Sequence, residues 1–186
     1  MLNRMGDASE ESVLVLRSRN GDPAAFEVLI GAYQRMIYSL TYRMSGSLAD
    51  AEDLTQETFI RAFQQLDSYR GEARFSTWLS RIAVNLSLNW RARESHRGEV
   101  HSKWALDAIT ENDSRDEFPD ELSHRVQAAL QRLPARQRAA LVLTVYQNHS
   151  HAEAARALHC TEATISWRVF AARQKLKHWL KGTVHE

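Results

Sequence analysis

The chain is poor in the residues that rigid or cross-linked folds use, with one cysteine, three prolines and seven glycines among 186 residues. The single cysteine, Cys160, excludes an intramolecular disulfide and is typical of a reducing compartment. No run of about eighteen apolar residues occurs, and the N-terminal stretch lacks the apolar core of a signal peptide. We therefore expect a cytoplasmic protein without membrane insertion.

Alternating apolar strands bounded by turn residues are also absent, which predicts an all-α fold. The chain has no G-x-S-x-G, Walker loop or H-E-x-x-H motif, so nothing indicates an enzyme or a cofactor. A metal site is a weak alternative because zinc needs four ligands at regular spacing. The candidate ligands straddle a helix start and a helix end: His149, His151, His159 and Cys160.

Charge is balanced overall, with 24 basic and 23 acidic residues, but it is unevenly distributed. Residues 61–97 contain seven arginines and three acidic residues, and residues 156–181 contain six basic residues and one acidic residue. Between them, from Asp107 to Glu121, seven acids face one arginine. This order predicts two polyanion-binding modules joined by a self-repelling linker.

The first half of the chain reads as four helices with short connections, which predicts a compact bundle. The boundary residues have the chemistry of helix caps and stops. They are Asn20-Gly21 as a stop, Asp22 with Pro23 as a start, Ser45-Gly46 as a stop, and Ser47 or Asp50 as a start. A short polar loop, residues 67–75, leads into the last helix.

That last helix, "FSTWLSRIAVNLSLNW" at residues 75–90, has two periodic sets of side chains. The expected buried stripe consists of Leu79, Ile82, Ala83, Leu86 and Trp90. At about 100° per residue a second set falls together beside it. This set, which we name the polar flank, consists of Trp78, Arg81, Asn85 and Asn89. Asparagine is a poor helix former, so an ordinary solvent-facing flank would favour Glu and Lys instead.

The preceding helix, "DAEDLTQETFIRAF", is predicted to bury Leu54, Thr58 and Ala62. Its opposite side gathers what we name the acidic face: Asp53, Gln56, Glu57 and Ile60. A lone acidic face is usually only solvated. An isoleucine among carboxylates nevertheless allows a binding patch for a basic protein.

Helical periodicity dissolves after Gly98 and resumes at Leu122, so the acidic stretch between them is predicted to be an extended linker. Farther on, Ser150 and Glu153 form a capping box before "HAEAARAL". The turn "HCT" then precedes a long basic helix, and this pattern is typical of a helix-turn-helix. His159 holds the left-handed position of the turn, where glycine is common.

In such a motif Ala154, Ala155 and Leu158 would pack against Ile165 and Val169. The second helix would then present polar and aromatic side chains to a DNA major groove. Its basic side chains would contact the DNA phosphate backbone. The groove-facing candidates are Thr161, Glu162, Thr164, Ser166, Trp167 and Arg168, and the backbone candidates are Arg173, Lys175 and Lys177. A basic surface helix without a nucleic-acid role is the alternative.

Two stretches together, "DAEDLTQETFIRAFQQLDSYRGEARFSTWLSRIAVN" and "LPARQRAALVLTVYQNHSHAEAARALHCTEATISWRVFAARQKL", resemble the extracytoplasmic-function (ECF) group of bacterial sigma factors. The motifs D-x-x-Q-[ED]-x-F and F-x-x-W-L-x-R-I-A-x-N carry the resemblance. It implies region two at 1–97, a linker at 98–120 and region four at 121–186. Two helical domains and no catalytic activity are expected.

The resemblance also implies partners. The acidic face, Asp53, Gln56, Glu57 and Ile60, would bind the beta-prime clamp helices of core RNA polymerase, and region four the beta flap. Region two would recognise and melt the minus-ten promoter element, region four would read the minus-thirty-five element, and the linker would follow the RNA exit path. An anti-sigma factor is a further expected partner. The family usually has a basic residue and Ser where this chain has Ser166 and Trp167.

Promoter melting gives the polar flank a physical role. An unstacked base needs a pocket, stacking and hydrogen bonds that offset the few kcal/mol of unstacking. Trp78 supplies stacking, Arg81 a phosphate contact, and Asn85 and Asn89 donors and acceptors. The loop from Ser68 to Arg74, with Gly71 allowing close approach, is the candidate base pocket. The full minus-ten set is Tyr69, Arg70, Gly71, Arg74, Phe75, Trp78, Arg81, Asn85 and Asn89.

Two other classes of protein stay open at this point. A conventional helix-turn-helix regulator would bind duplex operators without polymerase and would not need the acidic face. A metal or redox sensor would use the histidines and Cys160.

Overall fold

The computed structural model describes residues 8–101 and 121–181, and these form helices connected by turns. The first four helices are α1 (Ala8–Arg19), α2 (Pro23–Ser45), α3 (Leu48–Gln64) and α4 (Phe75–His101), with a short 3-10 turn, η1 (Leu66–Ser68), after α3. The others are α5 (Glu121–Gln131), α6 (Ala135–Leu141) with a π-helical turn, η2 (Val142–Tyr146), α7 (His151–Ala157) and α8 (Glu162–Leu180). The all-α prediction is confirmed.

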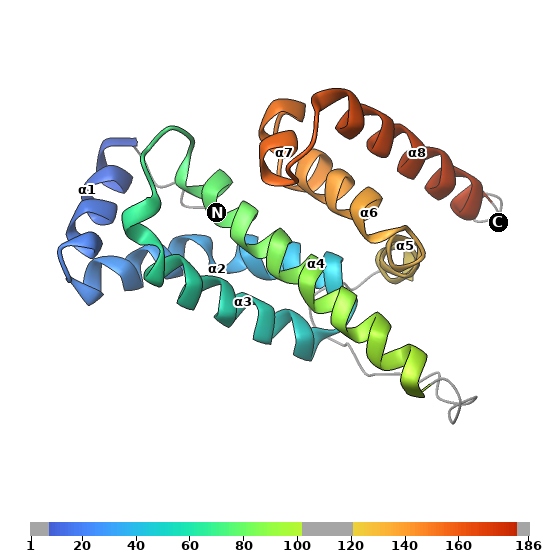
Figure 1. Ribbon diagram of the computed structural model, residues 1–186, viewed down its shortest axis with the longest axis horizontal. Helices are drawn as coiled ribbons and strands as arrows, with labels where there is room; N and C mark the ends of the chain where they lie inside the picture. Colours follow the sequence, from blue (N-terminus) through green and yellow to red (C-terminus); the bar gives the residue numbers. More distant parts are fainter. Residues whose placement is uncertain (1–7, 102–120, 182–186) are drawn as a thin grey trace.

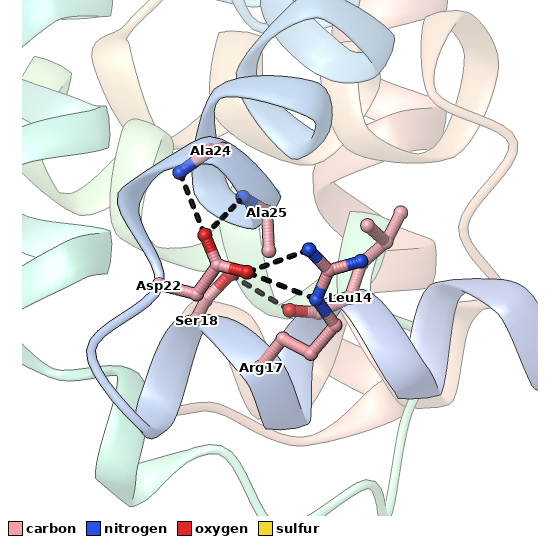
Figure 2. A network of polar contacts seen from close by, with 6 residues as sticks. All are labelled: Leu14, Arg17, Ser18, Asp22, Ala24 and Ala25. Atoms are coloured by element: carbon pink, nitrogen blue, oxygen red, sulfur yellow. Dashed lines mark hydrogen bonds and ion pairs between the residues drawn. The ribbon is translucent and has the colours of Figure 1, made fainter.

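The corner between α1 and α2 is fixed by Asp22, as Figure 2 shows. Its carboxylate accepts hydrogen bonds from the backbone N–H groups of Ala24 (3.0 Å) and Ala25 (3.3 Å). The Arg17 guanidinium donates to the same carboxylate at 2.7 Å. This hydrogen bond, foremost, holds the pKa of Asp22 below its ordinary value. The N-cap predicted from the sequence is therefore confirmed, with Pro23 at the first helical position.

The next boundary lies at the turn between α2 and α3. Gly46 ends α2 with φ of 85°, a left-handed conformation that glycine adopts without a Cβ clash. Ser47 then begins α3, and its hydroxyl accepts a hydrogen bond from the Asp50 N–H at 3.3 Å. The sequence had left Ser47 and Asp50 open as starts, and the cap geometry selects Ser47.

Helix α4 departs from its predicted pattern in two ways. Phe75, Leu79, Ala83 and Val84 are fully buried, whereas the expected stripe members Ile82, Leu86 and Trp90 are only half-buried. The buried stripe is therefore rotated toward Val84, which belongs to an apolar cluster that includes residues of α2, α3 and α6. The helix also continues to His101, beyond residue 97, the end that the resemblance implies for region two. The acidic linker lies largely outside the described residues.

In the second half, the structure confirms the helix-turn-helix elements. Ser150 and Glu153 form the capping box before α7, and Thr161 caps α8. The apolar side chains where α7 meets α8 are buried, among them Ala154, Leu158 and Ile165. His159 has φ of 49°, the left-handed turn conformation that the sequence predicted.

The two halves pack directly against each other, and Figure 1 shows α4 beside the orange helices α6 and α7. Helix α4 contacts α6 and α7, while α2 contacts α5, α6 and the π-helical turn. Buried apolar residues from both halves belong to one continuous cluster. The modules inferred from charge are thus parts of one packed unit in this conformation.

This packing gives Gly46 a second constraint. A Cβ at Gly46 would lie 2.6 Å from the Gln131 side chain of α5, whereas a Cβ at Gly21, with φ of 88°, would meet nothing within 4 Å. Both Gly→Ala substitutions should cost about 1 kcal/mol of unfolding free energy through the positive φ. Gly46→Ala should cost clearly more because Gln131 must also move. Urea unfolding of the two variants tests this, and equal losses would contradict a steric contribution from α5.

Candidate nucleic-acid and polymerase interface

A cleft of about 670 Å³ lies between the first module and α7. All four residues of the polar flank line it, together with Ile82 and Leu86, which the sequence had placed in the buried stripe. Tyr69 and Arg70 of the loop after α3 complete this wall. The spacing of three and four residues thus brings stacking, cationic and amide groups to one surface.

The opposite wall of the cleft belongs to α7. Its lining residues are Glu153, Arg156 and Ala157. The Asn85 side-chain amide donates to the Ala157 carbonyl at 3.5 Å, and the Thr77 hydroxyl donates to Glu153 at 3.3 Å. The polar flank therefore borders the second module: Trp78 and Asn85 are half-buried, whereas Arg81 and Asn89 stay exposed to solvent.

An aromatic cluster holds the start of α4 and the preceding loop together. Ring centroids of Tyr69 and Trp78 lie 5.4 Å apart, and Phe75 lies 5.4 Å from Trp78 and 5.3 Å from Tyr69. The Tyr69 hydroxyl donates to the Ala73 carbonyl at 2.8 Å, which closes the loop. Desolvation, foremost, raises the pKa of Tyr69. Trp78 both packs on the core and lines the cleft.

Phe75 requires a correction. The sequence placed it among the residues that contact minus-ten DNA, but its side chain has no exposed surface. It packs edge-on against Tyr69 and also contacts Tyr33, 5.6 Å away between centroids. A fully buried ring supports its neighbours and does not stack on a base in this conformation.

The predicted base-pocket loop lines a separate hollow of about 650 Å³ against α1. Tyr69, Arg70, Gly71 and Arg74 all contribute to it, and Gly71 has φ of 73° with open space around its Cα. Gly71 and Arg74 do not line the larger cleft. The minus-ten candidates thus form two adjoining surfaces that share Tyr69 and Arg70.

The acidic face on α3 is exposed as predicted. Leu54, Thr58 and Ala62 are buried, while Asp53, Gln56 and Ile60 lie on the surface. Glu57 is partly exposed and forms a 2.6 Å ion pair with Arg61, one turn later. Ile60 exposes 53% of its surface, so the face offers an apolar contact between carboxylates.

On α8 the predicted groove-facing residues have different partners. Thr161 and Thr164 bond to each other in the N-cap, and Ser166 bonds to His151 at 2.9 Å. Arg168 is half-buried, and its guanidinium donates to the Cys160 sulfur at 3.4 Å. Glu162, Trp167 and Arg173 are exposed, and Lys175 bonds to Gln137. Sequence reasoning omitted Phe170, which is as exposed as Trp167.

The proposed metal ligands have separate environments. His149 is buried, and its desolvation, foremost, lowers its pKa. His151 bonds to Ser166, and Cys160 accepts from Arg168. Among the residues that the structure describes, no group of three or more His, Cys, Asp or Glu side chains could hold a metal ion.

Three side chains of the second module bind the last carbonyls of α2, and sequence reasoning missed all three. Gln127 donates to the Tyr42 carbonyl at 2.8 Å, Gln131 to Arg43 at 3.1 Å, and Arg138 to Met44 at 2.5 Å. Arg138 has no exposed surface and also donates to the carbonyls of Gln131 and Leu133. Its position three and four residues before Leu141 and Val142 placed it on the apolar stripe, which could have indicated burial.

Burial, foremost, lowers the pKa of Arg138, and the charge of nearby Arg91 acts in the same direction. The guanidinium is held instead by carbonyl dipoles at the C-terminus of α2, where cations are stabilised. Arg91 adds a contact to the Gln131 carbonyl at 3.4 Å. The contact between the two modules therefore includes hydrogen bonds to the C-terminal end of α2.

Comparison with known families identifies both halves of the chain. Residues 29–97 match Sigma-70 region 2, and residues 123–176 match Sigma-70 region 4. The RNA polymerase sigma-H factor of Pseudomonas aeruginosa is 31% identical over 187 residues, which cover 95% of this chain and 97% of that protein. The chain belongs to the ECF group of RNA polymerase sigma factors.

Other relatives agree with this assignment. The ECF sigma-E factor of Escherichia coli K12 is 32% identical, with 92% of this sigma factor and 95% of that one covered. Two solved structures share the fold at 24% identity. One is RpoE from Bartonella quintana in complex with the anti-sigma factor NepR, with a TM-score of 0.67 and coverage of 84% and 96%. The other is CnrH with the cytosolic domain of CnrY, with a TM-score of 0.68 and coverage of 94% and 99%.

The family establishes the general function. This sigma factor recognises promoters for RNA polymerase, as a transcription initiation factor that binds core polymerase and DNA. Its relatives are non-catalytic. Within the described residues, every helix is too short or too polar to cross a membrane.

Arg138 provides a test of the interface between the modules. Arg138→Met should lower the unfolding free energy by about 2–4 kcal/mol, because buried carbonyls of Met44, Gln131 and Leu133 lose their donor. Arg136→Met, an exposed position on the same helix, is the matched control and should change stability by less than about 0.5 kcal/mol. Urea unfolding measures both. Similar values for the two variants would contradict a stabilising role for the buried guanidinium.

Proposed function

We propose that region two, residues 1–97, binds core polymerase through the acidic face and melts the minus-ten element through the polar flank. Residues 98–120 serve as the linker along the RNA exit path. Region four, residues 121–186, binds the beta flap and reads the minus-thirty-five duplex. The sigma factor acts in the cytoplasm with the polymerase and has no catalytic activity of its own. An anti-sigma factor is a further partner, by analogy with the complexes of the two structural relatives.

The observation that carries this proposal is the composition of the cleft wall. One surface holds the Trp78 ring, the Arg81 guanidinium and the amides of Asn85 and Asn89. An unstacked base stacks on an aromatic ring, its phosphate binds a guanidinium, and its Watson–Crick edge bonds an amide. A protein that bound only duplex DNA would not need these three chemistries side by side.

Access of an unstacked base to Asn85 requires movement of α7. Asn85 bonds to Ala157 of α7 in this conformation, and Glu153 and Arg156 form the opposite wall. The hydrogen bond from Asn85 to Ala157 must therefore break before the Asn85 amide can bind a base. Core polymerase supplies the competing binding surfaces for the two regions.

The acidic face is tested by charge reversal. The double substitution Asp53→Lys with Glu57→Lys should weaken core binding at least tenfold, since each carboxylate loses charge-assisted contacts and gains repulsion. Folding should change little because both residues lie on the surface. Glu27→Lys, an exposed carboxylate on α2, is the control. Affinity is measured by titrating labelled protein with core polymerase, and equal affinities of all variants would refute the assignment.

The polar flank is tested at the melting step. Replacing Asn85 and Asn89 with Ala should reduce promoter opening while core binding persists, and Ala should not harm the helix because it is the better helix former. Permanganate reactivity of promoter thymines, at matched holoenzyme occupancy, reports opening. A template with a pre-opened bubble should restore part of the activity. Unchanged thymine reactivity would mean that the amides do not bind the melted strand.

A further inference from the structure

The outer side of α8 has an unusual composition. Ile165, Val169 and Ala172 face the protein interior. At about 100° per residue the opposite side carries Ala163, Trp167, Phe170 and Gln174, all exposed, and we name these four residues the outer strip. Trp167 and Phe170 expose 62% and 61% of their surfaces. The part of the helix farthest from the core is thus largely apolar and uncharged.

Basic residues border the outer strip on both sides. Arg168 and Lys175 lie along one border, and Arg173 and Lys177 lie along the other. The first pair is tied to the helix-turn-helix body, Arg168 through Cys160 and Lys175 through Gln137. The cations therefore flank the apolar side chains without covering them.

This arrangement complements a DNA major groove. Two borders of positive charge match the phosphates on either side of a groove, and the strip between them would approach the base edges. At those edges the thymine C5-methyl is the apolar group available for contact. The tryptophan ring carries one N–H donor, at Nε1, and is otherwise apolar, so most of its surface can make only an apolar contact with a base edge.

We propose that Trp167, supported by Phe170 one turn later, recognises thymine in the minus-thirty-five element through its C5-methyl group. This inference rests on the proposed function of region four and adds a base preference to it. Burying one methyl is worth about 0.8 kcal/mol, which corresponds to about fourfold in affinity. Contact with two methyls would give about fifteenfold.

Deoxyuridine tests this inference because it pairs as thymine does but lacks the methyl. The holoenzyme is first used in run-off transcription to recover a promoter from a genomic library. Its affinity is then measured for duplexes that carry thymine or deoxyuridine throughout the minus-thirty-five element. A duplex with the same number of replacements in the spacer is the DNA control.

The wild-type holoenzyme should lose at least fourfold in affinity on the deoxyuridine element and nothing on the spacer control. Trp167→Ala should bind the thymine element more weakly and should no longer distinguish the two bases. Arg173→Ala should lose affinity equally on both elements, since a phosphate contact does not sense the methyl. Circular dichroism confirms that the exposed Trp167→Ala substitution leaves the helices intact.

Several results would overturn the inference. One is a wild-type holoenzyme indifferent to deoxyuridine, and another is Trp167→Ala retaining the full preference for thymine. Unchanged DNA affinity in Trp167→Ala would mean that the outer strip faces a protein instead. A minus-thirty-five element without any A·T pair would also refute it. Failure of the holoenzyme to transcribe any promoter would contradict the proposed function itself. That outcome is distinct from a failure of the thymine inference alone.

Discussion

The end of α2 is the constraint on which the arrangement of this sigma factor depends. An α-helix leaves its last carbonyls without intrahelical donors, and in a packed protein they need partners from elsewhere. Here the Gly46 N–H satisfies Tyr42, and side chains of region four satisfy Tyr42, Arg43 and Met44. A local requirement of one helix thereby fixes the position of the other module. These hydrogen bonds act together with the apolar cluster that both halves share, and α7 of the second module forms one wall of the cleft.

The chemistry of the contact explains how it can be both specific and reversible. Burying the Arg138 charge is unfavourable, and hydrogen bonds to carbonyl oxygens offset the loss of water. Glutamine amides form neutral hydrogen bonds, each with a net contribution of about 1 kcal/mol. When the modules separate, water can satisfy the same carbonyls and amides. The interface thus combines directional hydrogen bonds at the end of α2 with the apolar cluster that both halves share.

How well the sequence predicts each feature depends on how far apart along the chain the interacting residues lie. Asp22, Gly46 and the Ser150–Glu153 capping box act on neighbouring residues, so their roles could be predicted from short patterns. Helical periodicity likewise brought the polar flank and the acidic face to single surfaces. Burial of Phe75 and the rotated stripe of α4 depend on rings and helices packed from other elements, which periodicity does not include. The hydrogen bonds of Gln127, Gln131 and Arg138 to the end of α2 join residues more than eighty positions apart, and no local pattern specifies them.

The two surfaces proposed to bind DNA are unequally accessible in this conformation. Within the polar flank, Trp78 and Asn85 are half-buried and Asn85 bonds to α7, whereas the outer strip of α8 is open to solvent. In a two-state description, the apparent dissociation constant for a melted strand equals the intrinsic value divided by the fraction of molecules in which α7 has withdrawn. The apparent dissociation constant for duplex binding by α8 is not divided by such a fraction, because the outer strip is already exposed. If the proposed assignments hold, unbound molecules in this conformation distinguish paired from unpaired DNA by accessibility, before any difference in contact energy applies.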